Sequence, residues 1–301
     1  MIVRKVIVAL TLIVGLVGSS AAEPFDDAIV AYNNADFATA LRLIRPLADA
    51  GHAKAQTALG VMYLEGNGVL RDHSEAAKWL HMAATKGDAG AQYNLGHLYE
   101  KGLGVSVDFV EAAKWYRLAA KQKVVAAYHN LGVLHEKGLG VPQDYARAAM
   151  MFRAAADEGL ADAQLGLGNL YLHGKGLPQD YAAALKWHRL AADKGLLRAQ
   201  HDLGVIYESG SGVPQDYAEA VKWWLLAANR GLAQSQANLG ALYAMGRGVP
   251  QDYVRAYMWL SLSAAQGIPL AAEHRTKVER HMTPAQISEA MKLTREWKPS
   301  R

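Results

Sequence analysis

The sequence predicts an all-α protein, a solenoid of tandem 36-residue helix-turn-helix repeats. Three observations lead to this fold class. Glycine recurs every 36 residues, at Gly60, Gly96, Gly132, Gly168, Gly204 and Gly240. Two further glycines follow each of these in phase, as Gly66 and Gly68 do in the first repeat, and an aspartate such as Asp72 comes next. Ala and Leu dominate a hydrophobic share of 51%, which favours helices because these residues are the least costly to place in one.

The N-terminal segment over 1–22 is typical of a secretory signal peptide. Arg4 and Lys5 precede an apolar run over 6–17, and small residues follow, so cleavage is expected after Ala21 or Ala22. The alternative is an uncleaved membrane anchor, but a span needs about 20 apolar residues and this run is shorter. We therefore expect a periplasmic or secreted protein.

The residue pattern of each repeat predicts two helices joined by a turn that contains two glycines. In the second repeat, Ala91, Leu95 and Leu98 fall on one face of an amphipathic helix, which we call helix A. Gly102 and Gly104 are expected to end it, because two glycines one residue apart permit the positive φ angles of a tight turn. We call this glycine–any residue–glycine turn the GxG loop.

The second helix of each repeat, helix B, is expected to begin after an aspartate. Asp108 and Glu111 have the spacing of a capping box, in which each of two side chains caps the other residue's backbone N–H. Trp115 lies between small residues, and tryptophan recurs in phase in four other repeats. We interpret this tryptophan as core filling, since helices that pack closely alternate large and small side chains.

The third repeat departs from the others. His135 replaces a tyrosine, Met151 replaces the tryptophan, and Gln122-Lys123-Val124-Val125 replaces the usual glycine junction before the repeat. The missing glycine predicts an inter-repeat turn of different shape. The repeat is interpreted either as sequence drift or as a bend or functional site.

The ends of the chain differ from the repeats, as expected of a solenoid that must cover its terminal core. A helical pair without a GxG loop over 23–52 would cap one end, and helices over 268–301 the other, with Thr283 as N-cap, Pro284 at the first helical position and Gln286 at the third. The six repeats between them are placed at 53–87, 88–123, 124–159, 160–195, 196–231 and 232–267.

The repeat reads Ala-x-x-x-Leu-Gly-x-x-Tyr-x-x-Gly-x-Gly-Val-x-x-Asp-x-x-x-Ala-x-x-Trp, followed by an Ala-Ala pair, over 53–267. This motif resembles the Sel1-like repeats, which are relatives of the tetratricopeptide repeats with a longer interhelical loop. The resemblance implies a right-handed superhelical α-solenoid that acts as an adaptor or scaffold, often in bacterial envelopes, signalling or the assembly of complexes. Cysteine-rich exported members hold each repeat with a disulfide; this chain has no cysteine, so nothing specific to them carries over.

Composition and motifs argue against several function classes. The 32 Lys and Arg and 28 Asp and Glu residues are scattered, without the basic patch that binding to nucleic acid requires. The lack of cysteine excludes thiol catalysis and zinc-thiolate sites. No metalloprotease, nucleophile-elbow, Walker or dinucleotide motif occurs, and the local pair His97 and Glu100 is too small for a metal site. We expect neither catalysis nor a cofactor or metal.

The predicted partner-binding surface lies on helix A, on the arc opposite its leucines at about 100° per residue. Its residues vary between repeats, and they are Tyr93, His97, Glu100, His129, Glu136, Asn169, His201 and Glu208. If helix A lines the concave side of the solenoid, they form a groove for a protein partner. The alternatives are an ordinary solvated face, or an envelope glycan-binding or cell-wall-modifying protein that uses the same groove.

Overall fold

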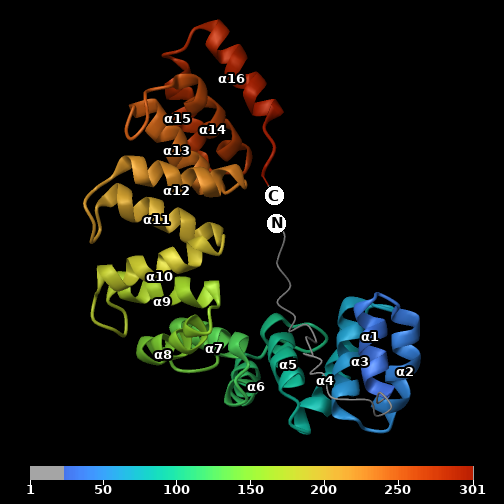
Figure 1. Ribbon diagram of the computed structural model, residues 1–301. Helices are drawn as coiled ribbons and strands as arrows, with labels where there is room; N and C mark the ends of the chain where they lie inside the picture. Colours follow the sequence, from blue (N-terminus) through green and yellow to red (C-terminus); the bar gives the residue numbers. More distant parts are fainter. Residues whose placement is uncertain (1–23, 301) are drawn as a thin grey trace, which may run out of the picture. The chain divides into compact units, whose positions relative to one another are not determined.

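The computed structural model describes residues 24–300, so the predicted signal peptide lies outside the described residues. Within that range the chain folds into α-helices and contains no strand (Figure 1). The helices are α1 (Pro24–Asn33), α2 (Phe37–Asp49), α3 (Ala53–Glu65), α4 (His73–Thr85), α5 (Ala89–Lys101), α6 (Phe109–Lys121), α7 (Val125–Lys137), α8 (Tyr145–Asp157), α9 (Ala161–His173), α10 (Tyr181–Asp193), α11 (Leu197–Ser209), α12 (Tyr217–Asn229), α13 (Ala233–Met245), α14 (Tyr253–Ala265), α15 (Pro269–Glu279) and α16 (Pro284–Glu296). No helix among these is both long and apolar enough to cross a membrane.

The chain divides into two compact units, one carrying α1–α8 and the other α9–α16. Helices pack in sequential pairs within each unit. The repeats are the hairpins α3·α4, α5·α6 and α7·α8 in the first unit, and α9·α10, α11·α12 and α13·α14 in the second. The odd-numbered helix of each hairpin is helix A and the even-numbered one is helix B, so the structure confirms the predicted all-α helical repeat.

The GxG loop ends helix A as the sequence predicts. Its first glycine is the left-handed C-cap, with φ between +62° and +79° across the six loops, and its second glycine has φ between +67° and +78°. The N–H of Gly102, for example, donates to the carbonyl of Leu98 and closes the last turn of α5. The second glycine is also required for steric reasons. A Cβ on Gly104 would lie 2.0 Å from the carbonyl oxygen of His73, which is the first residue of the preceding helix B.

Helix B begins at the predicted aspartate, but the reciprocal half of the capping box is absent. The Asp108 carboxylate accepts hydrogen bonds from the N–H groups of Val110 and Glu111 at 2.9 and 3.0 Å. The N–H of Asp108 donates instead to the carbonyl of Tyr99, at 2.9 Å. Glu111 therefore has no N–H to cap, and its carboxylate lies 3.0 Å from Lys114.

A buried glutamine joins helix A to the preceding helix B. The Nε2 of Gln92 donates to the carbonyl of Ala84 at 3.2 Å, and Gln56, Gln200 and Gln236 make the same bond at 3.1 to 3.2 Å in their repeats. Each of these bonds satisfies a helix-end carbonyl that would otherwise be buried without a partner. This glutamine was not among the predicted structural residues, although its 36-residue recurrence is a sufficient signal.

The turn before the third repeat keeps its shape, so the predicted change is wrong. Lys123 adopts φ +63°, the left-handed conformation of the glycine at this position in the other repeats. Its N–H donates to Ala120 at 2.9 Å, and the N–H of Val124 donates to Ala119 at 3.1 Å. The turn before the second repeat, at Gly87 and Asp88, has the same two bonds. Packing of the flanking helices therefore holds Lys123 in a left-handed conformation that lysine intrinsically disfavours.

The helices outside the repeats continue the packing. In the first unit, Phe25 and Ile29 of α1 pack with Ile44 of α2 and Leu59 of α3 in one hydrophobic cluster. In the second unit, the predicted start of α16 is confirmed, because Thr283 and Gln286 form a reciprocal capping box with Pro284 at the first turn. The ring of Trp297 lies 6.3 Å from that of Trp259, which brings the end of the chain onto helix α14.

Candidate partner-binding site

Helix A is enclosed on two sides, and this decides which of the predicted site residues are accessible. In α5, one side faces the preceding helix B, and the side carrying Gly96 faces the helix B of the same hairpin. A Cβ on Gly96 would lie 2.8 Å from the Tyr116 ring, so the two helices are in close contact there. The residue three positions before this glycine shares its face and is buried with it.

Tyr93 occupies that position, and its predicted place on an exposed arc is wrong. Its side chain is 2% exposed, and its ring lies 5.7 Å from that of Tyr116. Burial is the main cause that raises the pKa of Tyr93 to about 12. Tyr93 is therefore a core residue: the part of the arc that carries it faces a neighbouring helix and not solvent.

Glu100 and His97 are half-buried beside this tyrosine pair. The Tyr116 hydroxyl donates to Glu100 at 2.7 Å, and Lys101 pairs with the other oxygen. Burial acts to raise the pKa of Glu100, but the hydrogen bonds from Lys101 and Tyr116 outweigh it and hold the pKa below its ordinary value. Burial lowers the pKa of His97, with partial compensation from Glu100. At neutral pH these two residues present a carboxylate and a neutral imidazole.

His129 and Glu136 lie on α7, one repeat further along the first unit. The His129 ring packs against Phe152 of α8 at 5.6 Å, as Tyr93 packs against Tyr116. Glu136 is half-buried, and its backbone carbonyl accepts a hydrogen bond from Gln143 at 2.9 Å. The His129 ring is thus part of the packing inside a hairpin, while the Glu136 side chain is partly accessible.

The remaining predicted residues belong to the second unit. Asn169 lies 3.0 Å from Nε2 of His188, whose side chain is fully buried. His201 lies 3.0 Å from the Ser235 hydroxyl and packs against the Trp224 ring, and burial lowers its pKa. Burial raises the pKa of the half-buried Glu208.

The eight residues therefore do not share one environment. Tyr93, His129 and His201 pack against a helix B ring, while His97 and Asn169 occupy the position one turn further along helix A and are half-buried. Within residues 24–300, no group of three or more His, Asp and Glu side chains could hold a metal ion.

In α7 and α11, the face of helix A that remains accessible is a row of four positions, which we call the outer row. In α7 the outer row consists of Ala126, Asn130, Val133 and Lys137. In α11 it consists of Arg198, Asp202, Val205 and Ser209. All eight side chains are half-buried or exposed. His97 and Asn169 occupy the third position of this row in α5 and α9, so two of the predicted residues belong to it.

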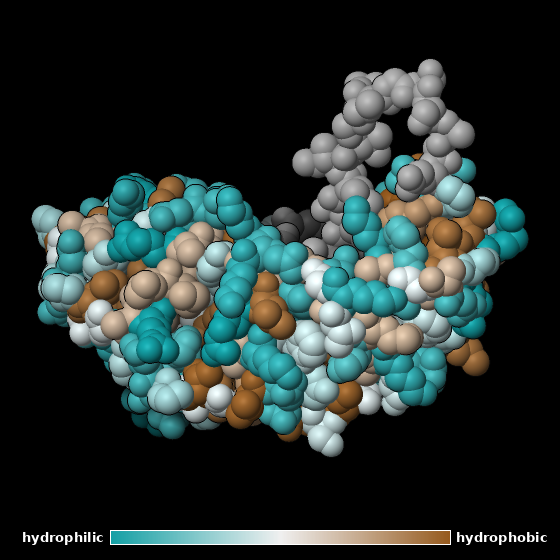
Figure 2. All heavy atoms as spheres, turned by 90° about the horizontal axis from the view of Figure 1, so that it is seen from below, coloured by the Kyte–Doolittle hydropathy of each residue, from teal (hydrophilic) through white to brown (hydrophobic). Residues whose placement is uncertain are grey.

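The second position of the outer row was not part of the predicted surface. Asn94, Asn130 and Asn238 occupy it in three repeats, and this recurrence is the signal that could have found it. Asn130 and Asn238 are half-buried, whereas Asn94 is only 3% exposed, so the position is not accessible in α5. In α11 the position holds Asp202, whose pKa is raised to about 6 by burial despite the partial compensation from Arg198. Figure 2 shows hydrophilic and hydrophobic residues interspersed on the face in view, so hydropathy alone does not mark a binding site there.

This protein is an α-helical repeat protein of the solenoid class. Its helix pairs recur every 36 residues, a glycine with positive φ ends each helix A, and an aspartate caps the start of each helix B. The family model described as Sel1 repeat matches residues 53–88, 89–124, 125–160, 161–196, 197–232 and 233–268. The chain therefore belongs to the Sel1-repeat family. Proteins of this family are generally protein-interaction scaffolds, and the fold is typically non-catalytic.

Two solved structures illustrate the relationship. A Sel1 repeat protein from Oxalobacter formigenes is 31% identical, with 80% of this chain and 97% of that chain covered and a TM-score of 0.74. The protein c5321, described as a protective antigen present in uropathogenic Escherichia coli strains displaying an SLR fold, is 26% identical, with 91% and 83% covered and a TM-score of 0.52. Comparison with curated proteins gives no match.

Proposed function

We propose that this protein is an exported, non-enzymatic scaffold that binds a protein partner through the outer row of helix A. One observation carries the proposal: the helices and turns are the same from repeat to repeat, while the residues of the outer row differ. The outer row of α7 shares no residue with that of α11 at three of its four positions, and the fourth is valine in both, at Val133 and Val205. A constant frame with variable accessible positions is how repeat proteins build specific binding surfaces.

The proposed surface differs from the one expected from sequence. Tyr93 is left out because it is buried, and His129 and His201 act as packing residues whose rings support the helix. His97 and Asn169 stay in the proposed surface as members of the outer row. The row mixes amide, carboxylate, aliphatic and basic groups, which suits a polar protein surface more than an apolar ligand.

Export rests on residues 1–22, where two basic residues precede a short apolar run and small residues. N-terminal sequencing of the protein recovered from the cells that express it tests this part. We expect the mature chain to begin at Ala22 or Glu23. An intact Met1 in the cytoplasmic fraction would rule out the export that we propose.

Site-specific photo-crosslinking tests the binding surface. A photoreactive side chain replaces Val205 of α11, which is 39% exposed in the outer row, or Leu226 of α12, which is 50% exposed on helix B of the same hairpin. Both sites are aliphatic and accessible, so Leu226 is the matched control. We expect a discrete protein adduct from Val205 and none from Leu226. Equal labelling at both sites, or adducts with glycan alone, would contradict protein binding through helix A.

A further inference from the structure

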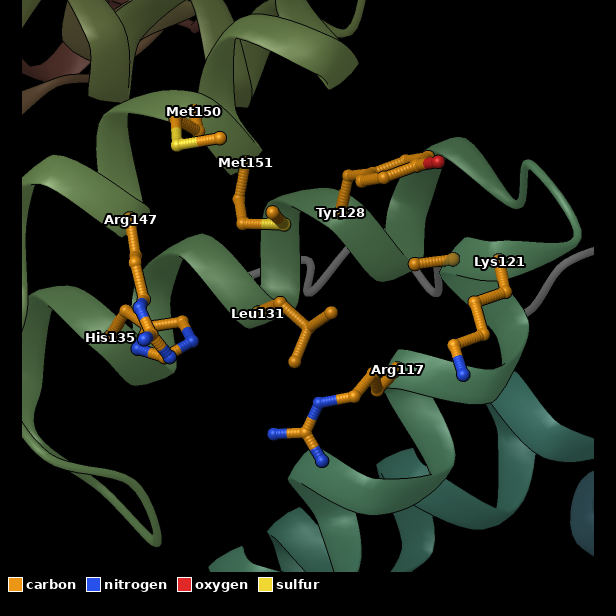
Figure 3. Close-up of a pocket in the computed structure, with 9 residues that line it drawn as sticks. Arg117, Lys121, Tyr128, Leu131, His135, Arg147, Met150 and Met151 are labelled. Atoms are coloured by element: carbon orange, nitrogen blue, oxygen red, sulfur yellow. The ribbon is translucent and has the colours of Figure 1, made fainter.

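A pocket of about 390 Å³ opens in the first unit between the two helices B that flank helix α7. Residues from the second half of α6, from α7 and from the first half of α8 surround it (Figure 3). Its lining consists of Arg117, Ala120, Lys121, Tyr128, Leu131, His135, Arg147, Met150 and Met151. This volume falls in the range of small-ligand pockets and accommodates a large side chain.

The pocket exists because the third repeat lacks a tryptophan. In the second repeat, Trp115 fills the equivalent space: its side chain is 5% exposed and packs in one cluster with Ala84 and Leu95. The pocket carries Ala120 and Leu131 at the positions that correspond to Ala84 and Leu95. Met151 corresponds to the tryptophan, and its unbranched side chain lacks an indole to cover them.

Three cations border the pocket, and none of them has a positively charged counterpart around Trp115. Arg117 corresponds to His81, Lys121 to Thr85, and Arg147 to Glu111, so one of the changes inverts the charge. Arg147 pairs with Asp144 at 3.2 Å. Arg117 and Lys121 form no ion pair with any side chain among residues 24–300, and no carboxylate belongs to the lining.

A buried imidazole adds a polar group that lacks a partner. His135 is 8% exposed, and its Nδ1 makes no hydrogen bond to the described part of the chain. The other five repeats all carry a tyrosine at this position, such as Tyr99. Buried polar atoms in native proteins nearly always have a partner, so an unpaired nitrogen in the wall of a pocket favours a polar ligand atom beside it.

We propose that this pocket receives a large aromatic side chain of the partner protein, flanked in the partner's sequence by carboxylates. The aromatic ring takes the place of the missing indole over Ala120 and Leu131, and Met150 and Met151 adapt to it, since methionine packs readily around aromatic rings. The carboxylates lie against Arg117 and the other two cations. The proposal rests on the proposed scaffold function only in that the occupant is a protein segment, and it does not depend on the outer row.

Methyl NMR of the full chain tests this proposal directly. The protein is labelled at its methionine methyl groups and titrated with the peptide acetyl-Asp-Trp-Glu-amide. We expect ring-current shifts at Met150 and Met151, which line the pocket, and none at Met82 and Met245, which are 37% and 49% exposed elsewhere. Acetyl-Asp-Ala-Glu-amide should cause no ring-current shift, and acetyl-Lys-Trp-Lys-amide should bind at least tenfold more weakly, because like charges repel.

Two variants take their residues from the other repeats and therefore suit the frame. Met151→Trp refills the pocket, so the Met150 shift should disappear while the melting temperature stays the same or rises. Arg147→Glu restores the acidic residue found at Glu111 and should weaken peptide binding roughly tenfold. Because the second variant leaves the apolar floor unchanged, it gives a result even if the first variant fails to fold.

The outcomes separate this proposal from the scaffold function. No shift at Met150 and Met151 at millimolar peptide, or equal shifts with the acidic and basic peptides, would overturn the pocket proposal. Binding that survives Met151→Trp would overturn it too. If the peptide binds as expected but Val205 gives no protein adduct, the pocket proposal stands and binding through helix A is contradicted. If Val205 gives an adduct but the peptide does not bind, binding through helix A stands and the pocket proposal is contradicted.

Discussion

Replacing Gly104 by alanine is expected to destabilise the protein through two separate effects. The first is conformational: Gly104 has φ +71°, and an L-residue in the left-handed region costs about 1–2 kcal/mol. The second is steric: the new Cβ would lie 2.0 Å from the carbonyl oxygen of His73 and 2.6 Å from the nitrogen of Ser74. Both atoms belong to the backbone at the start of α4, so they cannot move aside as a flexible side chain would.

Gly87 provides the matched control, because it has φ +92° and nothing lies within 4 Å of a Cβ built there. Gly87→Ala therefore carries the conformational cost alone, about 1–2 kcal/mol. Gly104→Ala adds an overpacking cost of about 1–3 kcal/mol, for a total of about 2–5 kcal/mol. Both positions lie in the first unit, so both variants report on the same part of the molecule.

Equilibrium urea denaturation, followed by far-ultraviolet circular dichroism, measures the free energy of unfolding of the two variants and the wild type. We expect Gly104→Ala to lose at least 1 kcal/mol more than Gly87→Ala. Equal losses would show that the loop does not press against α4, and a neutral Gly104→Ala would show that its backbone is not held at positive φ.

Three further predictions use the same measurement. Lys123→Gly should stabilise the chain by about 0.5–1 kcal/mol, because glycine removes the strain of a left-handed lysine; a loss would refute that reasoning. Tyr93→Ala should cost about 3 kcal/mol as a core truncation, against less than about 0.5 kcal/mol for the accessible Val205→Ala, and similar losses would argue against burial of Tyr93. Asp202→Asn should stabilise at neutral pH. The raised pKa, about 6 against an ordinary 3.8, means that the folded state binds the proton more tightly and loses stability as pH rises between these values. The gain from Asn should therefore grow over this window and vanish below it, and a gain independent of pH would exclude the titration of Asp202 as its cause.

The fold could be predicted in detail because each repeat carries its own local signals. Glycine pairs such as Gly102 and Gly104 determine where helix A ends, and Asp108 determines where helix B begins, through backbone interactions that span only a few residues. The repetition multiplies these signals six times over the matched repeats. Thr283 and Gln286 specify the start of α16 in the same local way.

The candidate site could be predicted only in part, because exposure depends on contacts between helices. The position of Tyr93 opposite Leu95 in a helical projection does not show that a second helix covers that side. His97 and Asn169 lie one turn further along helix A and are half-buried, and Asn169 contacts His188 of α10. The pocket at Met151 was marked in the sequence only as a departure from the repeat, and its volume and its border of cations emerge from three helices together.

The sequence by itself determined the helical repeat, its period, its GxG loops and the aspartates that begin helix B, since these depend on backbone preferences and on hydrogen bonds within a few residues. Only the tertiary structure decided that Tyr93 is buried, that Lys123 takes a glycine's conformation and that Gly104 touches the preceding helix. The physical reason is common to all three. Packing between helices adds contact energies larger than the preference of a single residue, and those contacts join positions more than 20 residues apart.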